Sequence, residues 1–138
     1  MKVIESDWMR LLHCSLLLMA MLSISACHSD SKPQSLKVTA TAYTSSKDET
    51  DSTPFLAAWG DTLNPGTKVI AVSRDLIKKG LSHGVKVSID GLDGEYTVLD
   101  KMNKRWRNKI DIYMGMDKQA AKEWGKRQVV ISWNNKSS

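Results

Sequence analysis

Two aspartates stand eleven positions apart where a proton-transfer site could be built. Asp100 lies near the end of the segment 95–101, EYTVLDK, and Asp111 lies within 109–114, KIDIYM. Strict alternation in KIDIYM puts the two isoleucines and the methionine on one face of a strand and Asp111 on the other. Such an aspartate is either a solvated residue on a half-exposed strand or an acid held in a groove to do chemistry.

The residues between the two aspartates bear on whether Asp111 could serve as an acid. A general acid needs its proton near neutral pH, whereas an ordinary Asp has a pKa of roughly 3.9. Burial or a second carboxylate such as Asp100 raises that pKa, and a nearby cation lowers it. Lys101 folded back onto Asp111 would keep the carboxylate ionised. The cations ahead of Asp111 are Lys101, Lys104, Arg105, Arg107 and Lys109.

Three aromatic residues are further candidates for a binding site. Trp59, in an irregular segment, and Trp106, in the loop between the aspartates, could stack on sugar rings or could pack as core or rim residues. Tyr43 could donate a hydrogen bond in a groove or pack in the core. We expect Trp124 and Trp133 to be core or rim residues.

The start of the chain predicts export. An almost uncharged apolar run, 11–25, follows Lys2 and Arg10, and we interpret residues 1–26 as a signal peptide. Ile24-Ser25-Ala26-Cys27 resembles a bacterial lipobox, which implies cleavage before Cys27 and lipid attachment to it. An ordinary signal peptide and an uncleaved anchor are the alternatives. We expect a membrane-anchored lipoprotein, on the periplasmic face of the outer membrane if the cell has one, because His28 fits that sorting.

Charge and cysteine content narrow the function classes. The chain of 138 residues has a formal net charge of +5, and removing 1–26 takes away two cations and two anions, so the charge stays the same. This charge favours an acidic polymer or a membrane surface as neighbour, and we expect no nucleic acid partner. Cys14 and Cys27 fall in or at the end of the signal, which leaves no disulfide framework and no cysteine metal site. His83 reads as a turn residue without a second histidine beside it, so we expect no metal and no cofactor.

The remaining sequence alternates like a β-rich domain after a polar tether, 27–35. A helix is expected at 117–124, with Asp117 as its cap and Gly125 just past its end, and a shorter helix or turn at 75–80. Asn64 to Gly66 reads as a turn, and 45–63 is irregular. Strands are expected at 36–44, 67–73, 85–91, 95–101, 109–114 and 127–133. Six short strands in about 100 residues predict a small closed or nearly closed β-barrel.

The order of segments TATAYT, TKVIAVSRDLI, LDKMNKRWRNKIDIYMG and AAKEWGKRQVVI resembles the 3D (three-aspartate) domain. That resemblance implies a mainly β fold over 36–134, a six-stranded double-psi β-barrel with one or two short helices. Asp111 falls on the final family aspartate, the implied catalytic acid, and Asp100 on the middle one. The first is expected where Ser73 stands, and Asp75 lies two residues on.

The family includes A-type membrane-bound lytic transglycosylases and small secreted muralytic proteins. The resemblance implies cleavage of the MurNAc–GlcNAc bond of peptidoglycan, with one Asp acting first as acid and then as base. The lost first aspartate, and Lys101-Met102 where the family has Thr-Gly, favour a non-catalytic, expansin-like glycan-binding barrel as the alternative. A lipoprotein adaptor with a basic docking face is a third hypothesis. We expect a monomer whose partners are peptidoglycan glycan strands and the membrane.

Overall fold

The structure, a computed structural model, describes residues 32–46 and 53–134. The predicted signal peptide 1–26, the lipidation site Cys27 and part of the irregular segment lie outside the described residues. Within the described ranges, no helix has both the length and the apolar character needed to cross a bilayer.

Six strands and two short helices make up the described chain. The strands are Gln34–Tyr43 (β1), Val69–Val72 (β2), Lys86–Ile89 (β3), Glu95–Lys101 (β4), Lys109–Tyr113 (β5) and Arg127–Trp133 (β6). The helices are Arg74–Ile77 (α2) and Lys118–Trp124 (α3). Every predicted strand is present. The first begins two residues early because the backbones of Gln34 and Ser35 pair with β6, although both side chains are exposed and polar.

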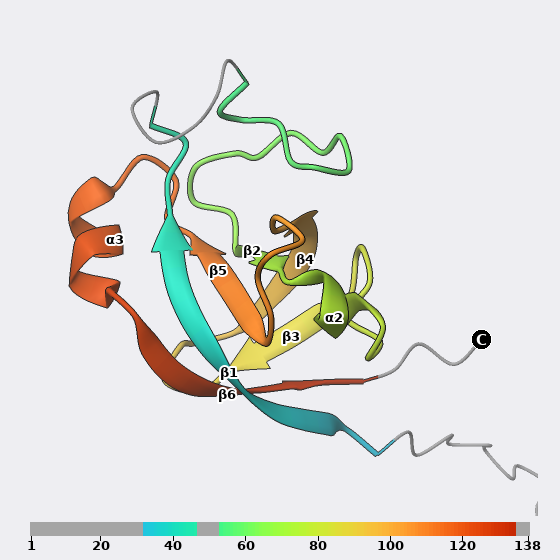
Figure 1. The fold of residues 1–138 in the computed structure, drawn as a ribbon. Coiled ribbons are helices and arrows are strands. Elements are labelled where there is room, and N and C mark those ends of the chain that lie inside the picture. Colours follow the sequence, from blue (N-terminus) through green and yellow to red (C-terminus); the bar gives the residue numbers. More distant parts are fainter. Residues whose placement is uncertain (1–31, 47–52, 135–138) are drawn as a thin grey trace, which may run out of the picture. The chain divides into compact units, whose positions relative to one another are not determined.

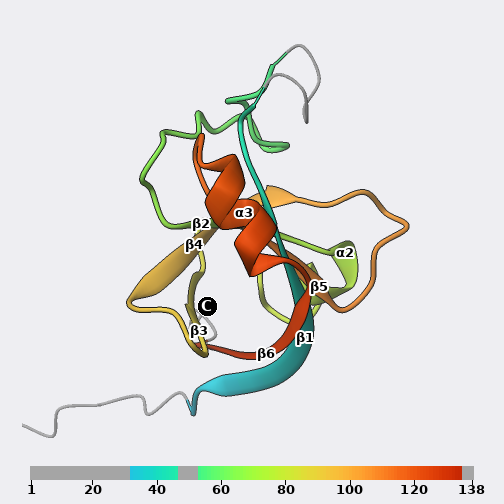
Figure 2. The same ribbon diagram turned by 90° about the vertical axis from the view of Figure 1, so that its left-hand side faces the viewer.

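The strands close into a barrel in the order β1-β5-β2-β4-β3-β6 (Figures 1 and 2). The pairs β1–β5 and β2–β4 are parallel and the other four pairs are antiparallel. Closure leaves no free sheet edge. The six-stranded mixed barrel with two short helices confirms the predicted fold class.

Alternate residues of the strands fill the barrel. Val38, Ile70, Val98, Ile110 and Ile131 are fully buried in one core cluster. The strand β2 is buried at all four positions, as its unbroken apolar run predicts, because its outer face is also covered. The isoleucines of β5 therefore point inward, and Asp111 between them belongs to the outer face of the barrel.

The helix α3 follows its sequence signals. The side chain of Asp117 accepts a hydrogen bond from the Ala120 N–H at 2.9 Å, which caps the first turn. Gly125, with φ of 62°, ends the helix in a conformation that favours glycine. Trp124 and Trp133 both pack with the main core, as expected. α3 lies against β1 (Figure 2).

Candidate functional site

The two aspartates are brought together by one alanine. Ala71 of β2 pairs with Asp111 of β5 on one side and with Asp100 of β4 on the other. Thr41 of β1 pairs with Asp111 in turn. Residues directly opposite each other share a sheet face, so these four residues form a row across four adjacent strands. The two aspartate Cα atoms are about 10 Å apart, which is two strand spacings.

A β-bulge gives Asp100 its place in the row. Ile70 pairs with Val98, but the next residue, Ala71, pairs with Asp100, so the register skips Leu99. Without this shift, alternation would put Asp100 on the same face as Val98, which lies in the core. Bulges re-aim side chains in this way.

Three residues of the row, Ala71, Asp100 and Asp111, line a hollow of about 250 Å³, here called the aspartate groove. The short side chain of Ala71 leaves open the space between the two carboxyl groups. The predicted site residues Tyr43, Asp100, Trp106 and Asp111 all line this groove. The remaining lining residues are Thr44, Ala71, Lys101, Met102 and Asn103.

Asp100 is held by hydrogen bonds on both carboxylate oxygens. Oδ1 accepts from the Ala58 N–H at 2.7 Å and from the Lys101 N–H at 2.8 Å. Oδ2 accepts from the Tyr43 hydroxyl at 3.3 Å. The Ala58 bond ties the irregular segment to β4, 42 residues away in sequence. Asp100 therefore fixes one wall of the groove, as an acceptor.

The surroundings of Asp111 raise the pKa of its carboxyl group above the ordinary value. Its Oδ1 accepts a hydrogen bond from the Thr41 hydroxyl at 2.8 Å. Burial raises the pKa of Asp111, and the negative charge of Asp100 adds to that rise. The Thr41 hydrogen bond and the charge of Lys109 oppose it, but the net pKa lies above the ordinary value. Burial, followed by the charges of Asp100 and Asp111, also raises the pKa of Tyr43, which stays a hydroxyl donor.

Neither Lys101 nor Lys109 forms an ion pair with Asp111. The Lys101 ammonium lies over the Trp59 ring, 5.3 Å from its centroid. The Lys109 ammonium lies 3.8 Å from the centroid of the Trp106 ring. Both lysines therefore make cation–π contacts with tryptophans instead of ion pairs with the acid.

Trp59 does not line the groove. It packs partly against the main core, and its ring meets that of His83 edge-on at 5.3 Å between centroids. His83 Nε2 lies 2.7 Å from Asp61 Oδ2. Sequence reasoning missed this pair, because nothing in the pattern relates positions 22 apart in two irregular segments. The position of His83 in a turn was predicted correctly.

Ser73 and Asp75, the candidate positions for a third aspartate, are also outside the groove. Ser73 is fully buried, and its Oγ accepts from the Lys109 N–H at 3.0 Å. Asp75 Oδ2 accepts from the Asn108 N–H at 3.0 Å. The segment after β2 thus secures the end of the loop 102–108, whose other end is held by the Met102 N–H bonded to Val72 O.

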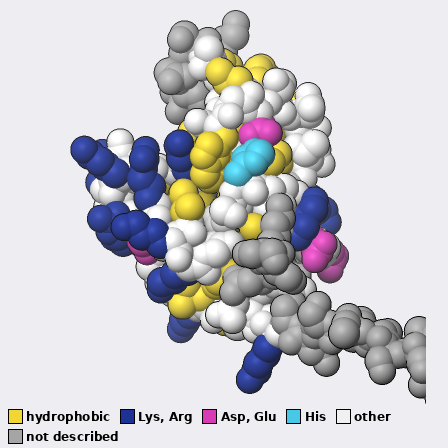
Figure 3. Space-filling view, turned by 90° about the vertical axis from the view of Figure 1, so that its right-hand side faces the viewer, with side chains coloured by type: hydrophobic (Ala, Val, Ile, Leu, Met, Phe, Trp, Pro, Cys, Tyr) yellow, Lys and Arg dark blue, Asp and Glu magenta, His cyan; other side chains and the backbone are white. Residues whose placement is uncertain are grey.

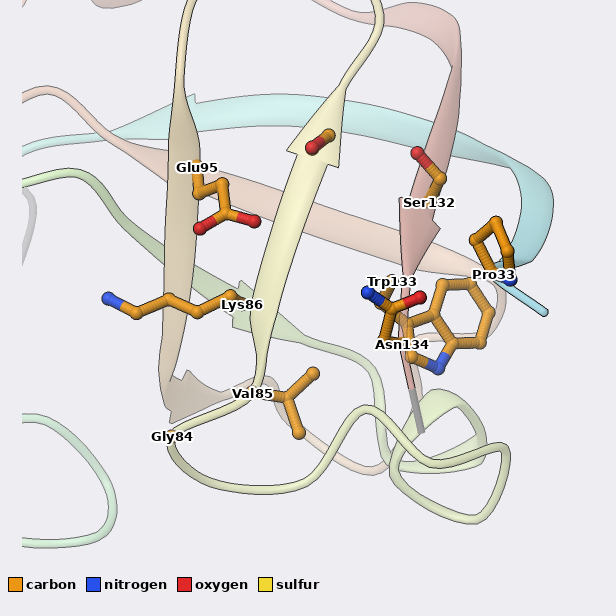
Figure 4. Close-up of a pocket in the computed structure, with 9 residues that line it drawn as sticks. Pro33, Gly84, Val85, Lys86, Glu95, Ser132, Trp133 and Asn134 are labelled. Carbon is orange, nitrogen blue, oxygen red and sulfur yellow. The ribbon is translucent and has the colours of Figure 1, made fainter. Parts of the chain in front are cut away.

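A second hollow, of about 270 Å³, lies between β3, β4 and β6 (Figure 4). Lys86 and Glu95 project from adjacent strands there, and Trp133 forms part of the wall. None of the predicted site residues lies in it. Among the described residues, no group of three or more His, Cys, Asp or Glu side chains could hold a metal ion.

Comparison with known proteins supports the fold. No family model matches the chain, and no curated protein matches it. A solved structure, the crystal structure of the apo form of Clavibacter michiganensis expansin, is similar with a TM-score of 0.50 and 14% sequence identity. The match covers 76% of this chain and 52% of the expansin chain, so this chain spans about half the length of that protein. At this identity the likeness shows the barrel fold alone, and the resemblance to the 3D domain stays a prediction.

Proposed function

We propose that the aspartate groove binds a peptidoglycan glycan strand and that Asp111 transfers the protons of a lytic transglycosylase reaction on the MurNAc–GlcNAc bond. The observation that carries the proposal is the Asp111 carboxyl group, whose pKa is raised by burial and by Asp100 in a groove. A carboxylic acid that holds its proton towards neutral pH is what a glycosidic leaving oxygen requires.

The reaction uses one carboxyl group twice. Asp111 gives its proton to the glycosidic oxygen as the bond from that oxygen to the muramic acid C1 breaks. The resulting carboxylate then takes the proton of the muramic acid 6-hydroxyl as that oxygen bonds to C1 and closes the anhydro ring. Asp111 ends protonated again, and no water is consumed. The Thr41 hydroxyl binds Oδ1, which leaves Oδ2 to carry the proton.

Other groove residues have supporting roles in this proposal. Trp106 is 38% exposed, and a sugar can stack on the part of its ring that the Lys109 ammonium does not cover. Tyr43 and Asp100 form a hydrogen-bonded wall that orients the strand. Asp100 acts on the chemistry through its charge, by raising the pKa of Asp111.

A second candidate is a barrel that binds wall glycans without cutting them. The structural likeness to an expansin favours it, and so does the absence of a third aspartate from the groove. In this case the groove would bind the strand, and the raised pKa of Asp111 would serve no proton transfer.

Anchoring to the membrane is part of the proposal and rests on the sequence. Ile24 to Cys27 would be processed as a lipobox, and the lipid on Cys27 would hold the barrel, as a monomer, beside the wall. In a cell with two membranes, His28 favours the periplasmic face of the outer one.

The wild-type activity test separates the two candidates. Purified sacculi are incubated with the full-length protein, and released fragments are analysed by mass spectrometry for anhydro-muramic ends. A transglycosylase releases such ends with time. Binding to sacculi with no release of fragments supports the binding barrel. A protein that neither binds sacculi nor releases fragments would contradict both candidates.

A further inference from the structure

One loop lines two different hollows. Met102, Asn103 and Trp106 face the aspartate groove, whereas Lys104 and Arg107 line a separate hollow of about 380 Å³. The rest of that second hollow comes from α2 and the residue after it: Arg74, Asp75 and Lys78. We call it the cationic hollow. Figure 3 shows Lys and Arg side chains gathered at one side of the molecular face.

The cationic hollow has an excess of positive charge. Its lining has four cations and a single carboxylate, Asp75, and hence three net positive charges. The Oδ2 atom of Asp75 accepts a hydrogen bond from the Asn108 backbone N–H. In the ranges 32–46 and 53–134 the only ion pair is His83 with Asp61. The four cations of the hollow therefore have no ion-pair partner among the described residues.

The two arginines are held in place by backbone carbonyls. Arg74 Nε donates to Met102 O at 3.4 Å, and Arg107 Nη1 donates to Lys104 O at 2.8 Å. Each guanidinium has five N–H donors. The hydrogen bonds of the described residues therefore leave several donors on each arginine for an anion. A guanidinium fork suits a carboxylate, which it can bind through two parallel hydrogen bonds.

The position of the hollow beside the groove indicates the kind of anion. Trp106 of the groove and Arg107 of the hollow are consecutive residues, with Cα atoms about 3.8 Å apart. A polymer whose sugars lie in the groove would hold the substituents of those sugars close to the loop that also lines the hollow. In peptidoglycan that substituent is a peptide with free carboxylates.

We propose that the cationic hollow binds the peptide carboxylates of the strand whose sugars occupy the aspartate groove. The inference rests on the proposed function and adds a specificity to it: the protein prefers peptide-bearing glycan to bare glycan. The cations of the loop then bind the peptide of the substrate. Ser73 and Asp75 position these cations, because their hydrogen bonds fix the end of the loop to the start of α2.

The test compares two double variants that lose the same charge. Lys104→Gln with Arg107→Gln removes two cations of the hollow, and Lys122→Gln with Lys126→Gln removes two exposed cations on or just after α3. Binding of the full-length protein is measured on native sacculi, on sacculi whose carboxylates have been amidated, and on glycan strands stripped of peptide. All substituted side chains are exposed, and thermal melts verify that both variants fold.

The expected result is a loss of roughly tenfold in affinity for native sacculi in the hollow variant and little change in the matched control. The wild type should bind amidated sacculi as weakly as the hollow variant binds native ones. Equal weakening by both double variants would show diffuse charge attraction and overturn the inference. So would a hollow variant that still distinguishes native from amidated sacculi.

Two further measurements distinguish this inference from the proposed function and from membrane binding. Wild type that fails to bind peptide-free strands, while still losing affinity on amidation, would contradict the groove and uphold the hollow. Vesicles of anionic phospholipid test the other anionic surface. If the hollow variant loses vesicle binding but keeps wild-type binding to native sacculi, the occupant is the membrane and the inference is wrong.

Discussion

Replacing Asp100 should loosen the wall of the groove in a way that depends on the replacement. Asp100→Ala removes the acceptor for the Ala58 and Lys101 N–H groups and for the Tyr43 hydroxyl. Asp100→Asn keeps an oxygen that can accept the two N–H bonds, but it removes the charge and puts an amide donor where Oδ2 accepts from the Tyr43 hydroxyl. We therefore expect the alanine variant to be clearly the less stable of the two.

The magnitude follows from the contacts. A hydrogen bond to a charged acceptor contributes about 1.5–3 kcal/mol net. Asp100 is only half-buried and Ala58 is exposed, so water can replace part of each lost bond. We expect Asp100→Ala to cost about 2–3 kcal/mol in the free energy of unfolding and Asp100→Asn about 1 kcal/mol or less. For a domain of about 100 residues, the alanine variant should melt about 8–24 °C below wild type.

Thermal melts and amide hydrogen exchange measure this prediction. The Ala58 amide should exchange faster in Asp100→Ala than in Asp100→Asn, because its acceptor is gone. Asp90→Ala is the matched control, since Asp90 is exposed and its carboxylate makes no hydrogen bond with the described residues. If both Asp100 variants melted within about 2 °C of each other, Asp100 would not be the anchor of the groove wall.

Three other predictions concern pH and anchoring. Thr41→Val removes a hydrogen bond that lowers the pKa of Asp111, so the pH profile of cutting should move to higher pH. Asp100→Asn removes a charge that raises the pKa of Asp111, so the profile should move to lower pH. Profiles that do not move would contradict the assignment of Asp111 as the acid. Because the folded pKa of Asp111 lies above its unfolded value, folding is favoured by the proton and stability falls as pH rises through the folded pKa. Urea melts should therefore find Asp111→Asn more stable than wild type at pH 8 and similar to wild type near pH 3. The same stability difference at both pH values would contradict a raised pKa of Asp111 in the folded protein. Labelled palmitate should enter wild type and not Cys27→Ala, and equal labelling would exclude the lipobox.

The sequence predicted the barrel well because its signals are local. Alternation in β5 and the unbroken apolar run of β2 each show which side chains are buried. Asp117 and Gly125 mark the ends of α3 by well-understood capping chemistry. The first residues of β1 gave no such signal, because Gln34 and Ser35 contribute only backbone pairing.

The site was harder to predict because it depends on contacts between distant segments. No residue pattern around Leu99 predicts the β-bulge that pairs Asp100 with Ala71. Trp59 and Trp106 looked equivalent in sequence, yet only Trp106 lines the groove, because the position of Trp59 is set by Lys101 and His83. The sequence also left open whether Lys101 folds back onto Asp111; its ammonium instead lies over the Trp59 ring, a contact between segments that are far apart in the sequence.

The proton on Asp111 is the central claim, and Asp111→Asn tests it most directly. The variant keeps the side-chain shape and can still accept the Thr41 hydrogen bond, but it cannot exchange a proton. The rate of anhydro-muramic end formation from sacculi should be measured for wild type and variant, with sacculus binding and the melting temperature as controls. We predict a fall of at least roughly 10²-fold in rate with binding and folding retained. An Asp111→Asn protein that releases anhydro ends at the wild-type rate would contradict the mechanism.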